Sequence, residues 1–271
     1  MISCKEYVEI QKKELEEKVK GFKRKPKLVV VQVDHDKASD SYIKSKRNAS
    51  SDIGIIFEHV EIDSGKYSND DLAKKLIELN TDPEVDGIIV QLPIPDKYDV
   101  EELQKCISPD KDVDGFRPDS CFDSCTPKGI RDWLKFNGFN FKGKNVTVVG
   151  RGKTVGLPFV NMAIKEGATV TCCNSSTKSL SRFMYNSDLV VVAIGRAKYF
   201  NSDDFKNVGI VVDVGINRDE NGKLCGDVDS SDFERCLPNT YCTPVPGGVG
   251  KMTVITLMQN IVEAYEMHVC E

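Results

Sequence analysis

The sequence predicts an α/β fold in two domains, each built around a parallel sheet. Short runs rich in β-branched residues alternate with amphipathic helical patterns, which is typical of βαβ units. These runs form two series, and a segment rich in Asp, Pro and Gly separates them. The chain has 271 residues, of which 40% are apolar, so it is long enough for one large or two modest domains with a substantial core.

The first series predicts three strands and two helices. In chain order these are strand 27–33 (KLVVVQV), helix 40–52, strand 57–62, helix 70–80 and strand 87–93 (GIIVQLP). Ser39 or Asp40 is expected to cap the first helix, and Gly54 suits its C-terminal end.

The second series predicts a doubly wound parallel sheet with four strands. In chain order they lie within residues 145–150 (NVTVVG), 168–174 (ATVTCCN), 188–195 (DLVVVAIG) and 208–217 (VGIVVDVGIN). All four are expected to be fully buried, because their apolar runs are continuous.

The domain boundary is expected within residues 108–129, after which a helix follows that carries the only Trp. Residues 1–124 would then form the first domain and residues 125–248 the second. The last helical pattern, at residues 253–268, predicts a helix that returns to the first domain, so that residues 249–271 belong with it.

Composition and charge exclude several classes of function. Lys and Arg number 37 against 42 Asp and Glu, a net charge of −5, and no basic run is long enough for a nucleic-acid interface. The N-terminus lacks the apolar core of a signal peptide, and no apolar run approaches the length of a membrane span. We therefore expect a cytoplasmic protein with a small-molecule partner and neither a nucleic-acid nor a membrane partner.

The ten cysteines do not have the spacing of a metal site or of a disulfide framework. No CxxC pair occurs, and the three histidines are scattered through the chain. We expect reduced cysteines that pack as small apolar side chains, and no bound metal.

Three glycines follow the first strand of the second series. A Walker A loop needs its first glycine at position 147, where Thr147 lies inside the strand, so Gly152-Lys153-Thr154 is not part of a P-loop. Gly150, Gly152 and Gly156 instead have nearly the spacing of a dinucleotide turn, in which a helix N-terminus holds a pyrophosphate. The alternative is a glycine-rich turn without a ligand.

The end of the next strand indicates which dinucleotide fits. NAD sites place an acid there, roughly 20 residues beyond the loop, whereas residues 173–177 read CNSST. Without a carboxylate to repel a 2′-phosphate, and with Lys178 and Arg182 nearby, the sequence favours NADP over NAD. Arg151 and Ser175 are the expected contacts, the alternative being solvated loop residues.

The first series carries candidates for acid–base chemistry. Tyr42 and Lys46 are four residues apart and therefore project from one face of a helix. By spacing alone such a pair is more often a solvated helix face. Gln91 ends a strand, where open α/β sheets place ligands, and an amide holds an amine without adding a charge. Asp114 lies in an acidic stretch that could be a solvated turn, a metal loop or a carboxylate facing a guanidine-like pterin edge.

Taken in order, these segments resemble the bifunctional methylenetetrahydrofolate dehydrogenase/methenyltetrahydrofolate cyclohydrolase family over nearly the whole chain. The resemblance rests on blocks at the right spacing: Ser39 with Tyr42-x-x-x-Lys46, QLPIP at 91–95, PDKDVDGF at 109–116, CTPKGI at 125–130, VVGRG with VGLP at 148–158, VDVGIN at 212–217, GDVD at 226–229 and TPVPGGVGKMT at 243–253.

The resemblance implies a role for each site residue. Lys46 would be the general acid/base and Gln91 would orient it and tune its acidity, while Tyr42 would stack on the folate and Asp114 would bind the pterin edge. The remaining implied contacts are Ser39, Pro246, Gly247 and Gly248 for the substrate, and Gly150, Arg151, Gly152, Gly156, Ser175, Thr126 and Ile216 for the cofactor.

The implied activity is NADP-dependent oxidation of 5,10-methylenetetrahydrofolate to the methenyl form and hydrolysis of that product to 10-formyltetrahydrofolate, in one-carbon metabolism. The implied partners are tetrahydrofolate derivatives, including polyglutamylated ones, and a second copy of the chain in a homodimer through the cofactor domain. Since relatives without the cyclohydrolase tend to lack the lysine, Lys46 favours both activities.

The chain departs from the usual family pattern at four places. Gly152 replaces a serine, Asn174 replaces a histidine that is often found there, Lys251 replaces a proline, and residues 33–37 (VDHDK) differ from the usual loop start. Two other hypotheses stay open: a monofunctional NAD-linked dehydrogenase of the same fold, and a catalytically silent dinucleotide-binding scaffold.

Overall fold

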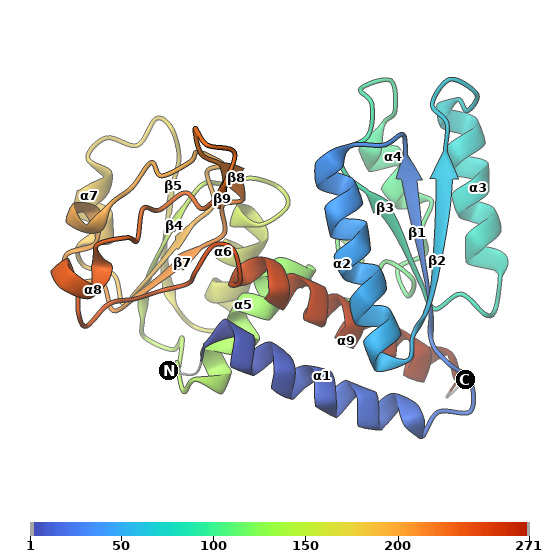
Figure 1. The fold of residues 1–271 in the computed structure, drawn as a ribbon, viewed down its shortest axis with the longest axis horizontal. Coiled ribbons are helices and arrows are strands. Elements are labelled where there is room, and N and C mark those ends of the chain that lie inside the picture. The colour runs from blue at the N-terminus through green and yellow to red at the C-terminus, as the bar shows by residue number, and fades with distance from the viewer. Residues whose placement is uncertain (1–2, 270–271) are drawn as a thin grey trace. The chain divides into compact units, whose positions relative to one another are not determined.

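The structure, a computed structural model, describes residues 3–269 and divides into two compact units. The N-terminal unit comprises Glu9–Cys125 together with the residues from Val254 onward. The central unit comprises Thr126–Thr253 together with the residues up to Val8. Figure 1 shows the elements of both.

The N-terminal unit is built around a three-stranded parallel sheet of order β2-β1-β3. Its elements, including two helices that continue into the other unit, are α1 (Cys4–Lys20), β1 (Lys27–Val33), α2 (Lys37–Ile53), β2 (Ile56–Ile62), α3 (Asn69–Thr81), β3 (Gly87–Gln91), α4 (Val100–Lys105) and α9 (Val249–Val269). The chain crosses from β1 to β2 in one direction and from β2 to β3 in the other. Right-handed crossovers therefore put α2 and α3 on opposite faces of the sheet, as Figure 1 shows.

The ends of α2 differ in part from those predicted. The helix begins at Lys37, so Ser39 and Asp40 lie in its first turn and the expectation that either caps it is wrong. Asp36 has the capping role instead, because its Oδ2 accepts the backbone N–H of Ser39 at 2.9 Å. Gly54 follows the last turn with φ of 93°, which confirms the predicted C-terminal stop.

The C-terminal helix α9 packs on the N-terminal unit, as the sequence predicted. The ring of Tyr265 stacks on Phe22 with centroids 4.3 Å apart. Asn260 is fully buried, and its Nδ2 donates to the carbonyl of Val113 at 2.8 Å. These contacts tie α9 to the start of the unit and to the segment that carries Asp114.

The central unit is built around a five-stranded parallel sheet of order β10-β7-β6-β4-β5. Its elements are α5 (Cys125–Phe136), β4 (Asn145–Val149), α6 (Gly156–Lys165), β5 (Thr169–Cys173), α7 (Leu180–Met184), β6 (Leu189–Val192), η1 (Ser202–Phe205), β7 (Ile210–Asp213), β8 (Asn217–Arg218), β9 (Leu224–Cys225), α8 (Phe233–Cys236) and β10 (Tyr241–Cys242). From β4 the chain runs outward to β5 and then back past β4 to β6. This reversal confirms a doubly wound sheet of the Rossmann type with its switch point between β4 and β6.

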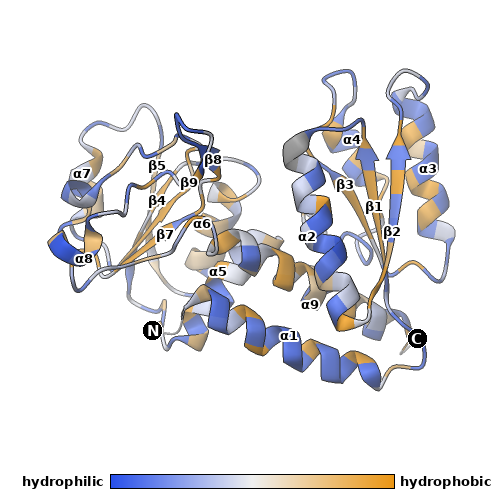
Figure 2. Ribbon diagram, viewed as in Figure 1, coloured by the Kyte–Doolittle hydropathy of each residue, from blue (hydrophilic) through white to orange (hydrophobic). Residues whose placement is uncertain are grey.

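Three of the four predicted strands are almost wholly buried, but β5 is not. Every residue of β4, β6 and β7 after the first is buried. Most of these residues are apolar, and orange segments mark them on β4 and β7 in Figure 2. The strand β5 pairs only with β4, so it is an edge strand with Thr169 and Cys172 exposed. The expectation of full burial is therefore wrong for this strand, because an apolar run does not reveal a strand's place in the sheet.

The first turn of α1 belongs to the core of the central unit. Cys4 and Tyr7 are buried there beside Trp133, and the Tyr7 ring meets Phe136 edge-on at 5.4 Å. The sequence did not indicate this, because an amphipathic helix does not show which surface it covers.

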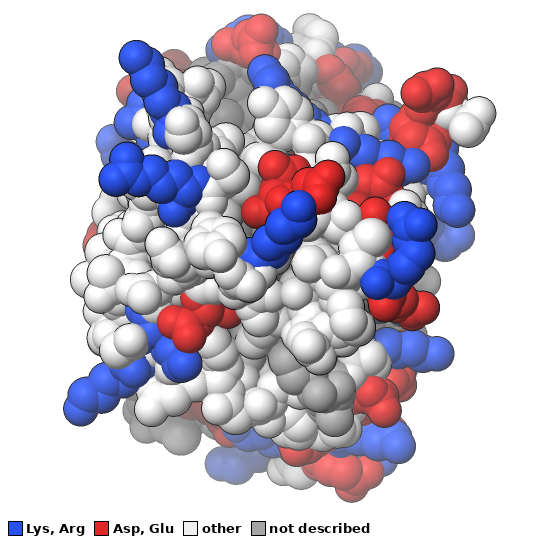
Figure 3. Space-filling model, turned by 90° about the vertical axis from the view of Figure 1, so that its left-hand side faces the viewer, with Lys and Arg blue, Asp and Glu red and all other residues white. Residues whose placement is uncertain are grey.

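The described surface carries mixed charge. On the face that carries α7 and α8, Lys and Arg side chains are interspersed with Asp and Glu and separated by uncharged areas (Figure 3). None of the helices within residues 3–269 is long and apolar enough to cross a membrane. The same residues contain no group of three or more His, Cys, Asp or Glu side chains that could hold a metal ion.

Candidate active site

The structure brings Lys46 and Gln91 together. Lys46 lies on α2 and is 6% exposed, while Gln91 is the last residue of β3. Nζ of Lys46 donates to Oε1 of Gln91 at 3.0 Å. Within the described part of the chain, Lys46 forms no ion pair with a carboxylate. The result is a buried amine whose partner is a neutral amide.

The side-chain nitrogen of Gln91 fixes the orientation of the amide, so that its oxygen faces the amine. Nε2 donates to the carbonyl of Leu92 at 2.8 Å. An amide donates through nitrogen and accepts through oxygen, so this bond directs Oε1 toward Lys46. Gln91 therefore accepts from the amine in one orientation and adds no charge.

Tyr42 and Ser39 precede Lys46 on the same helix. Tyr42 lies one turn earlier and is half-buried, and burial raises the pKa of its hydroxyl, so the phenol stays neutral at physiological pH. Ser39 is buried, and its Oγ donates to Oδ2 of Asp36 at 2.7 Å and approaches the carbonyl of Leu92 at 3.4 Å. The hydroxyl of Ser39 is thus engaged with the start of α2 and with the end of β3.

Asp114 lies in a tight turn and is half-buried. Gly115, with φ of 69°, allows this turn, because a Cβ there would lie 2.6 Å from the backbone nitrogen of Ser124. Buried Asp112 accepts the backbone N–H of Arg117 at 2.9 Å, and burial raises its pKa to about 6. The carboxylate of Asp114 accepts no hydrogen bond from the residues that the structure describes, so it is available to a ligand.

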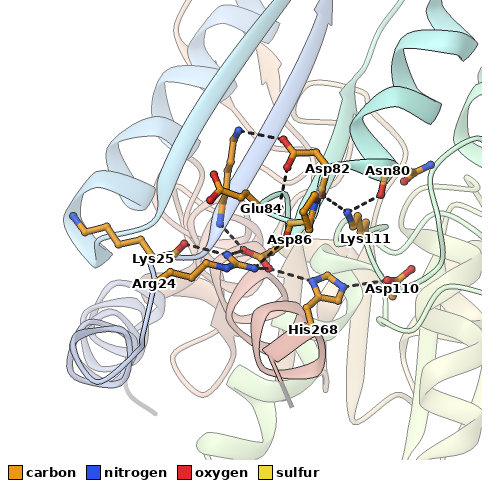
Figure 4. A network of polar contacts seen from close by, with 11 residues as sticks. Arg24, Lys25, Asn80, Asp82, Glu84, Asp86, Asp110, Lys111 and His268 are labelled. Carbon is orange, nitrogen blue, oxygen red and sulfur yellow. Dashed lines mark hydrogen bonds and ion pairs between the residues drawn. The ribbon is translucent and has the colours of Figure 1, made fainter. Parts of the chain in front are cut away.

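A network of polar contacts holds the segment leading to Asp114 (Figure 4). Fully buried Asp86 accepts from two nitrogens of Arg24, at 2.6 and 2.8 Å. The His268 ring lies between Asp86 and Asp110, with Nδ1 3.1 Å from the first carboxylate and Nε2 3.1 Å from the second. The network therefore links α9 to the start of β3 and to the acidic segment.

Lys111 continues this network, as Figure 4 shows. It is buried, and its Nζ donates to the carbonyls of Asn80 and Asp82 at 2.8 Å each. Its carbonyl also accepts from Ile88 of β3 at 2.9 Å. Within the acidic stretch, Asp110 and Lys111 thus have structural partners, which leaves Asp114 as the candidate for ligand binding.

In the central unit the glycine turn follows β4 at the switch point of the sheet. Gly150 has φ of 108°, and a Cβ there would lie 2.1 Å from the carbonyl oxygen of Ala193. A Cβ at Gly156 would lie 2.0 Å from the carbonyl oxygen of Gly150. Both positions therefore require glycine. A Cβ at Gly152 would meet nothing within 4 Å, so this glycine leaves open space where the family pattern usually has a serine.

The turn has the features of a dinucleotide site. The helix α6 begins at Gly156, and Val155 before it forms no side-chain cap. The N–H of Leu157 donates to the carbonyl of Gly152 at 3.1 Å, within the turn itself. Close backbone packing at a helix N-terminus, at the switch point of the sheet, is what binding of a pyrophosphate requires. The residues present therefore fit a dinucleotide.

Arg151 and Ser175 lie at neighbouring strand ends. Val149 of β4 pairs with Cys173 of β5, and each site residue follows two positions later. Parallel neighbours are about 4.8 Å apart, so the two loops start side by side. Both side chains are exposed, as are those of Lys178 and Arg182.

Asn174, which stands where the family often has a histidine, has a structural role. Its Oδ1 accepts the N–H of Ser176 at 2.8 Å, and its own N–H donates to Oγ1 of Thr177 at 2.9 Å. Asn174 thus shapes the turn that carries Ser175.

The remaining predicted cofactor and substrate contacts of this unit lie near the start of α9. A Cβ at Gly250 would lie 3.6 Å from Cδ1 of Ile216, so the exposed Ile216 side chain borders the turn that contains Pro246, Gly247 and Gly248. Oγ1 of Thr126 lies 2.9 Å from Oγ1 of Thr253, on the same helix as Gly250. Gly248 requires glycine, because a Cβ would lie 2.4 Å from the carbonyl oxygen of Pro244.

Sequence reasoning did not identify two buried carboxylates of the central unit, Asp213 and Asp227, which are 2% and 0% exposed. Asp213 ends β7, and its Oδ1 accepts from the N–H groups of Gly215 and Asp227 at 2.9 and 3.0 Å. An acid that ends an apolar run was the available signal, and the VDVGIN and GDVD blocks contain both residues.

Comparison with known proteins gives consistent matches over the whole chain. The tetrahydrofolate dehydrogenase/cyclohydrolase catalytic-domain model matches residues 2–114, and the NAD(P)-binding-domain model of the same family matches residues 124–269. The bifunctional protein FolD of Bacillus subtilis is 39% identical over 97% of this chain and 96% of its own length. That of Agathobacter rectalis is 41% identical over 93% and 94%.

Solved structures agree with these matches. The bifunctional FolD enzyme of Campylobacter jejuni superposes with a TM-score of 0.92 at 37% identity and covers 98% of each chain. The FolD enzyme of Trypanosoma brucei, solved with NADP cofactor and an inhibitor, has a TM-score of 0.90 at 30% identity, covering 100% of this chain and 98% of its own. With matches to both domain models and to full-length relatives, the chain belongs to the tetrahydrofolate dehydrogenase/cyclohydrolase family.

Proposed function

We propose that this protein is a bifunctional enzyme that oxidises 5,10-methylenetetrahydrofolate with NADP and hydrolyses the 5,10-methenyl product to 10-formyltetrahydrofolate. The observation that carries the proposal is the buried contact between Lys46 and Gln91 in the N-terminal unit, within a chain that also has a dinucleotide turn. Family membership supports the same pair of reactions.

Lys46 is proposed as the general acid/base of the hydrolysis. Water adds to the cationic methenyl carbon and loses one proton. The hydroxyl of the adduct then loses its proton as the carbonyl forms and one carbon–nitrogen bond breaks, and the leaving nitrogen gains a proton. A neutral lysine amine can take the first proton, give it to the leaving nitrogen and take the hydroxyl proton, which then passes to solvent. The partner amide of Gln91 holds the amine by its Nζ and brings no carboxylate charge near it.

Substrate binding is assigned to side chains around Lys46 and to the turn before α9. The half-buried phenol of Tyr42 would stack on the folate. Asp114, whose carboxylate has no hydrogen-bond donor among residues 3–269, would accept the two N–H groups of a pterin edge. The remaining proposed substrate contacts are Ser39, Pro246, Gly247 and Gly248.

NADP, when bound, supplies the acceptor for the hydride that leaves the methylene carbon. Gly150 and Gly156 would allow its pyrophosphate to approach the amides at the start of α6, and Gly152 leaves space beside them. Arg151 and Ser175 would hold the 2′-phosphate, since residues 173–177 offer no acid in its place. Thr126 and Ile216 would flank the nicotinamide. The protein contributes position rather than new chemistry to this step.

The experiment that tests this proposal is an absorbance assay with purified protein and methylenetetrahydrofolate. NADP⁺ and NAD⁺ are supplied in parallel, and the reduced cofactor and the methenyl chromophore are followed together. We expect reduction with NADP⁺, and little build-up of the methenyl intermediate. Reduction only with NAD⁺ would indicate the monofunctional alternative, and reduction with neither cofactor would indicate a silent scaffold.

We also propose that the chain has two functional domains, with bounds close to those of the two compact units. Residues 1–124 together with 249–271 would bind the folate and carry its chemistry, and residues 125–248 would bind the cofactor. The contacts divide the chain next to Cys125 and Thr253, which supports this assignment, and residues 3–8 pack with the central unit.

A homodimer through the cofactor domain completes the proposal. Exposed apolar side chains on α6, Leu157 at 45% and Ile164 at 56%, together with the edge strand β5, support such an interface. The substrates would include polyglutamylated folates. A cytoplasmic location fits the nine free cysteines of the described chain.

A further inference from the structure

We propose that Asp227 is a positioning residue for the cofactor, because its buried carboxylate fixes the loop after β6, which lies beside the glycine turn at the switch point of the sheet. The inference rests on the proposed function, and concerns the dehydrogenase step only. None of the expected cofactor contacts includes this residue.

The carboxylate of Asp227 accepts hydrogen bonds from the backbone of this loop. Its Oδ2 accepts the N–H groups of Ile194 and Gly195 at 2.7 and 3.1 Å, and its Oδ1 accepts that of Arg196 at 2.7 Å. Oδ1 also accepts from Nδ2 of Asn217 at 2.9 Å, in the loop after β7. The N–H groups of three consecutive residues thus point at one carboxylate, and these hydrogen bonds favour this conformation of the loop.

This loop lies against the glycine turn. The N–H of Ala193, the first residue after β6, donates to the carbonyl of Val149, the last residue of β4, at 2.8 Å. A Cβ at Gly150 would lie 2.1 Å from the carbonyl oxygen of Ala193 and 3.4 Å from Cγ2 of Ile194. Open α/β sheets bind ligands between the two loops at a switch point, here those after β4 and β6. A shift of residues 194–196 therefore changes the cofactor side of the crevice.

The carboxylate of Asp213 in turn fixes the backbone at Asp227. Asp213 accepts the N–H of Asp227 at 3.0 Å through Oδ1 and that of Val228 at 2.9 Å through Oδ2. Two glycines leave room for the pair: a Cβ at Gly215 would lie 2.4 Å from Cγ of Asp227, and one at Gly226 would lie 1.8 Å from Oδ2 of Asp213. The loops after β6 and β7 and the 226–228 segment thus form one rigid group.

The test is Asp227→Asn, which keeps the shape of the side chain. Each carboxylate oxygen accepts from two donors, so either orientation of the new amide places its NH₂ against two N–H groups. Charged hydrogen bonds of this kind are strong, and we expect the Kd for NADP, measured by calorimetry, to rise about tenfold or more. Hydrolysis of methenyltetrahydrofolate without NADP should stay within about twofold of wild type, since it uses Lys46.

Two controls separate positioning from general damage. Asp229→Asn makes the same charge change two residues away, where the carboxylate accepts from Ser231 of its own turn, its N–H at 3.2 Å, and it should leave the Kd unchanged. Phe205→Leu weakens the core cluster against which Ile194 also packs, and it leaves every hydrogen bond of Asp227 in place. It should lower the unfolding temperature without raising the Kd for NADP.

An unchanged Kd in Asp227→Asn, or an equal rise in Phe205→Leu, would overturn the inference. Calorimetry does not depend on turnover, so a wild-type protein that fails to bind NADP would instead overturn the proposed function. If Asp227→Asn does not fold, Asn217→Ala removes one donor and leaves the carboxylate in place. A rise in Kd of about threefold would then support the inference, and no rise would contradict it.

Discussion

The two candidate sites depend on different parts of the chain. In the N-terminal unit the chemistry belongs to side chains: a buried amine and the amide that holds it, Lys46 and Gln91. In the central unit the close packing belongs to the backbone: a Cβ at Gly150 or Gly156 would meet a carbonyl oxygen at 2.1 or 2.0 Å, whereas Arg151 is exposed. The first site should lose its activity when a side-chain functional group is removed. The second should lose cofactor affinity when a substitution adds a Cβ at one of these glycines.

Removal of the Lys46 amine gives the largest expected effect. Lys46→Gln should lower hydrolysis of methenyltetrahydrofolate by about 100- to 10,000-fold, the usual contribution of a general acid/base. Oxidation of the methylene substrate should continue within a few fold. The measurement is the decay of the methenyl chromophore.

Lys44→Gln is the matched control for that substitution. It makes the same change half a turn earlier on α2, where the side chain is exposed, and it should leave hydrolysis unchanged. Substantial hydrolysis by Lys46→Gln would refute the assigned role.

Addition of a methyl group to the glycine turn gives the next largest effect. Gly156→Ala places a Cβ against the carbonyl oxygen of Gly150, and overpacking of this kind costs enough to weaken NADP binding by about 10- to 100-fold. Gly152→Ala, whose Cβ would meet nothing within 4 Å of the protein, is the control and should bind NADP more tightly than Gly156→Ala. Equal Kd values by calorimetry would contradict the account of the turn.

A negative charge next to the Lys46 amine tests why its partner is a neutral amide. Gln91→Glu keeps an acceptor for Lys46 but offers it a carboxylate, which stabilises the ammonium form. Hydrolysis near neutral pH should fall by about tenfold, and its pH optimum should move upward. Gln104→Glu makes the same charge change on α4, and an identical pH profile in both variants would count against the role of Gln91.

Loss of an exposed cofactor contact gives the smallest effect. Arg151→Ala should raise the KM for NADP by about five- to tenfold, the contribution of one solvated contact to a phosphate. The KM for NAD, which lacks that phosphate, should change little. Steady-state kinetics with both cofactors checks this, and equal changes in the two constants would exclude the phosphate contact.

Much of the fold follows from local pattern. Strand β1 occupies the residues predicted, and Gly54 ends α2 because it adopts a positive φ. The pattern did not place Asp36 as the cap, since Ser39 and Asp40 are equally good capping residues by type. It also could not show that β5 is an edge strand, because the strand order is a property of the whole sheet.

The candidate site was predictable only in part. Spacing put Tyr42 and Lys46 on one helix face, but the contact between Lys46 and Gln91 joins residues 45 positions apart and depended on the family resemblance. The carboxylates of Asp213 and Asp227 act on backbone N–H groups, which any residue but proline supplies. The sequence does not reveal which amides will meet them.

The most direct test of the account compares wild type with Lys46→Gln in one reaction that starts from methylenetetrahydrofolate and NADP⁺. The measured quantity is the ratio of methenyltetrahydrofolate accumulated to NADPH formed. We expect a ratio near zero for wild type and near one for the variant, because oxidation continues when hydrolysis has stopped. The same ratio in both proteins would contradict the claim that the two units carry separable parts of the chemistry.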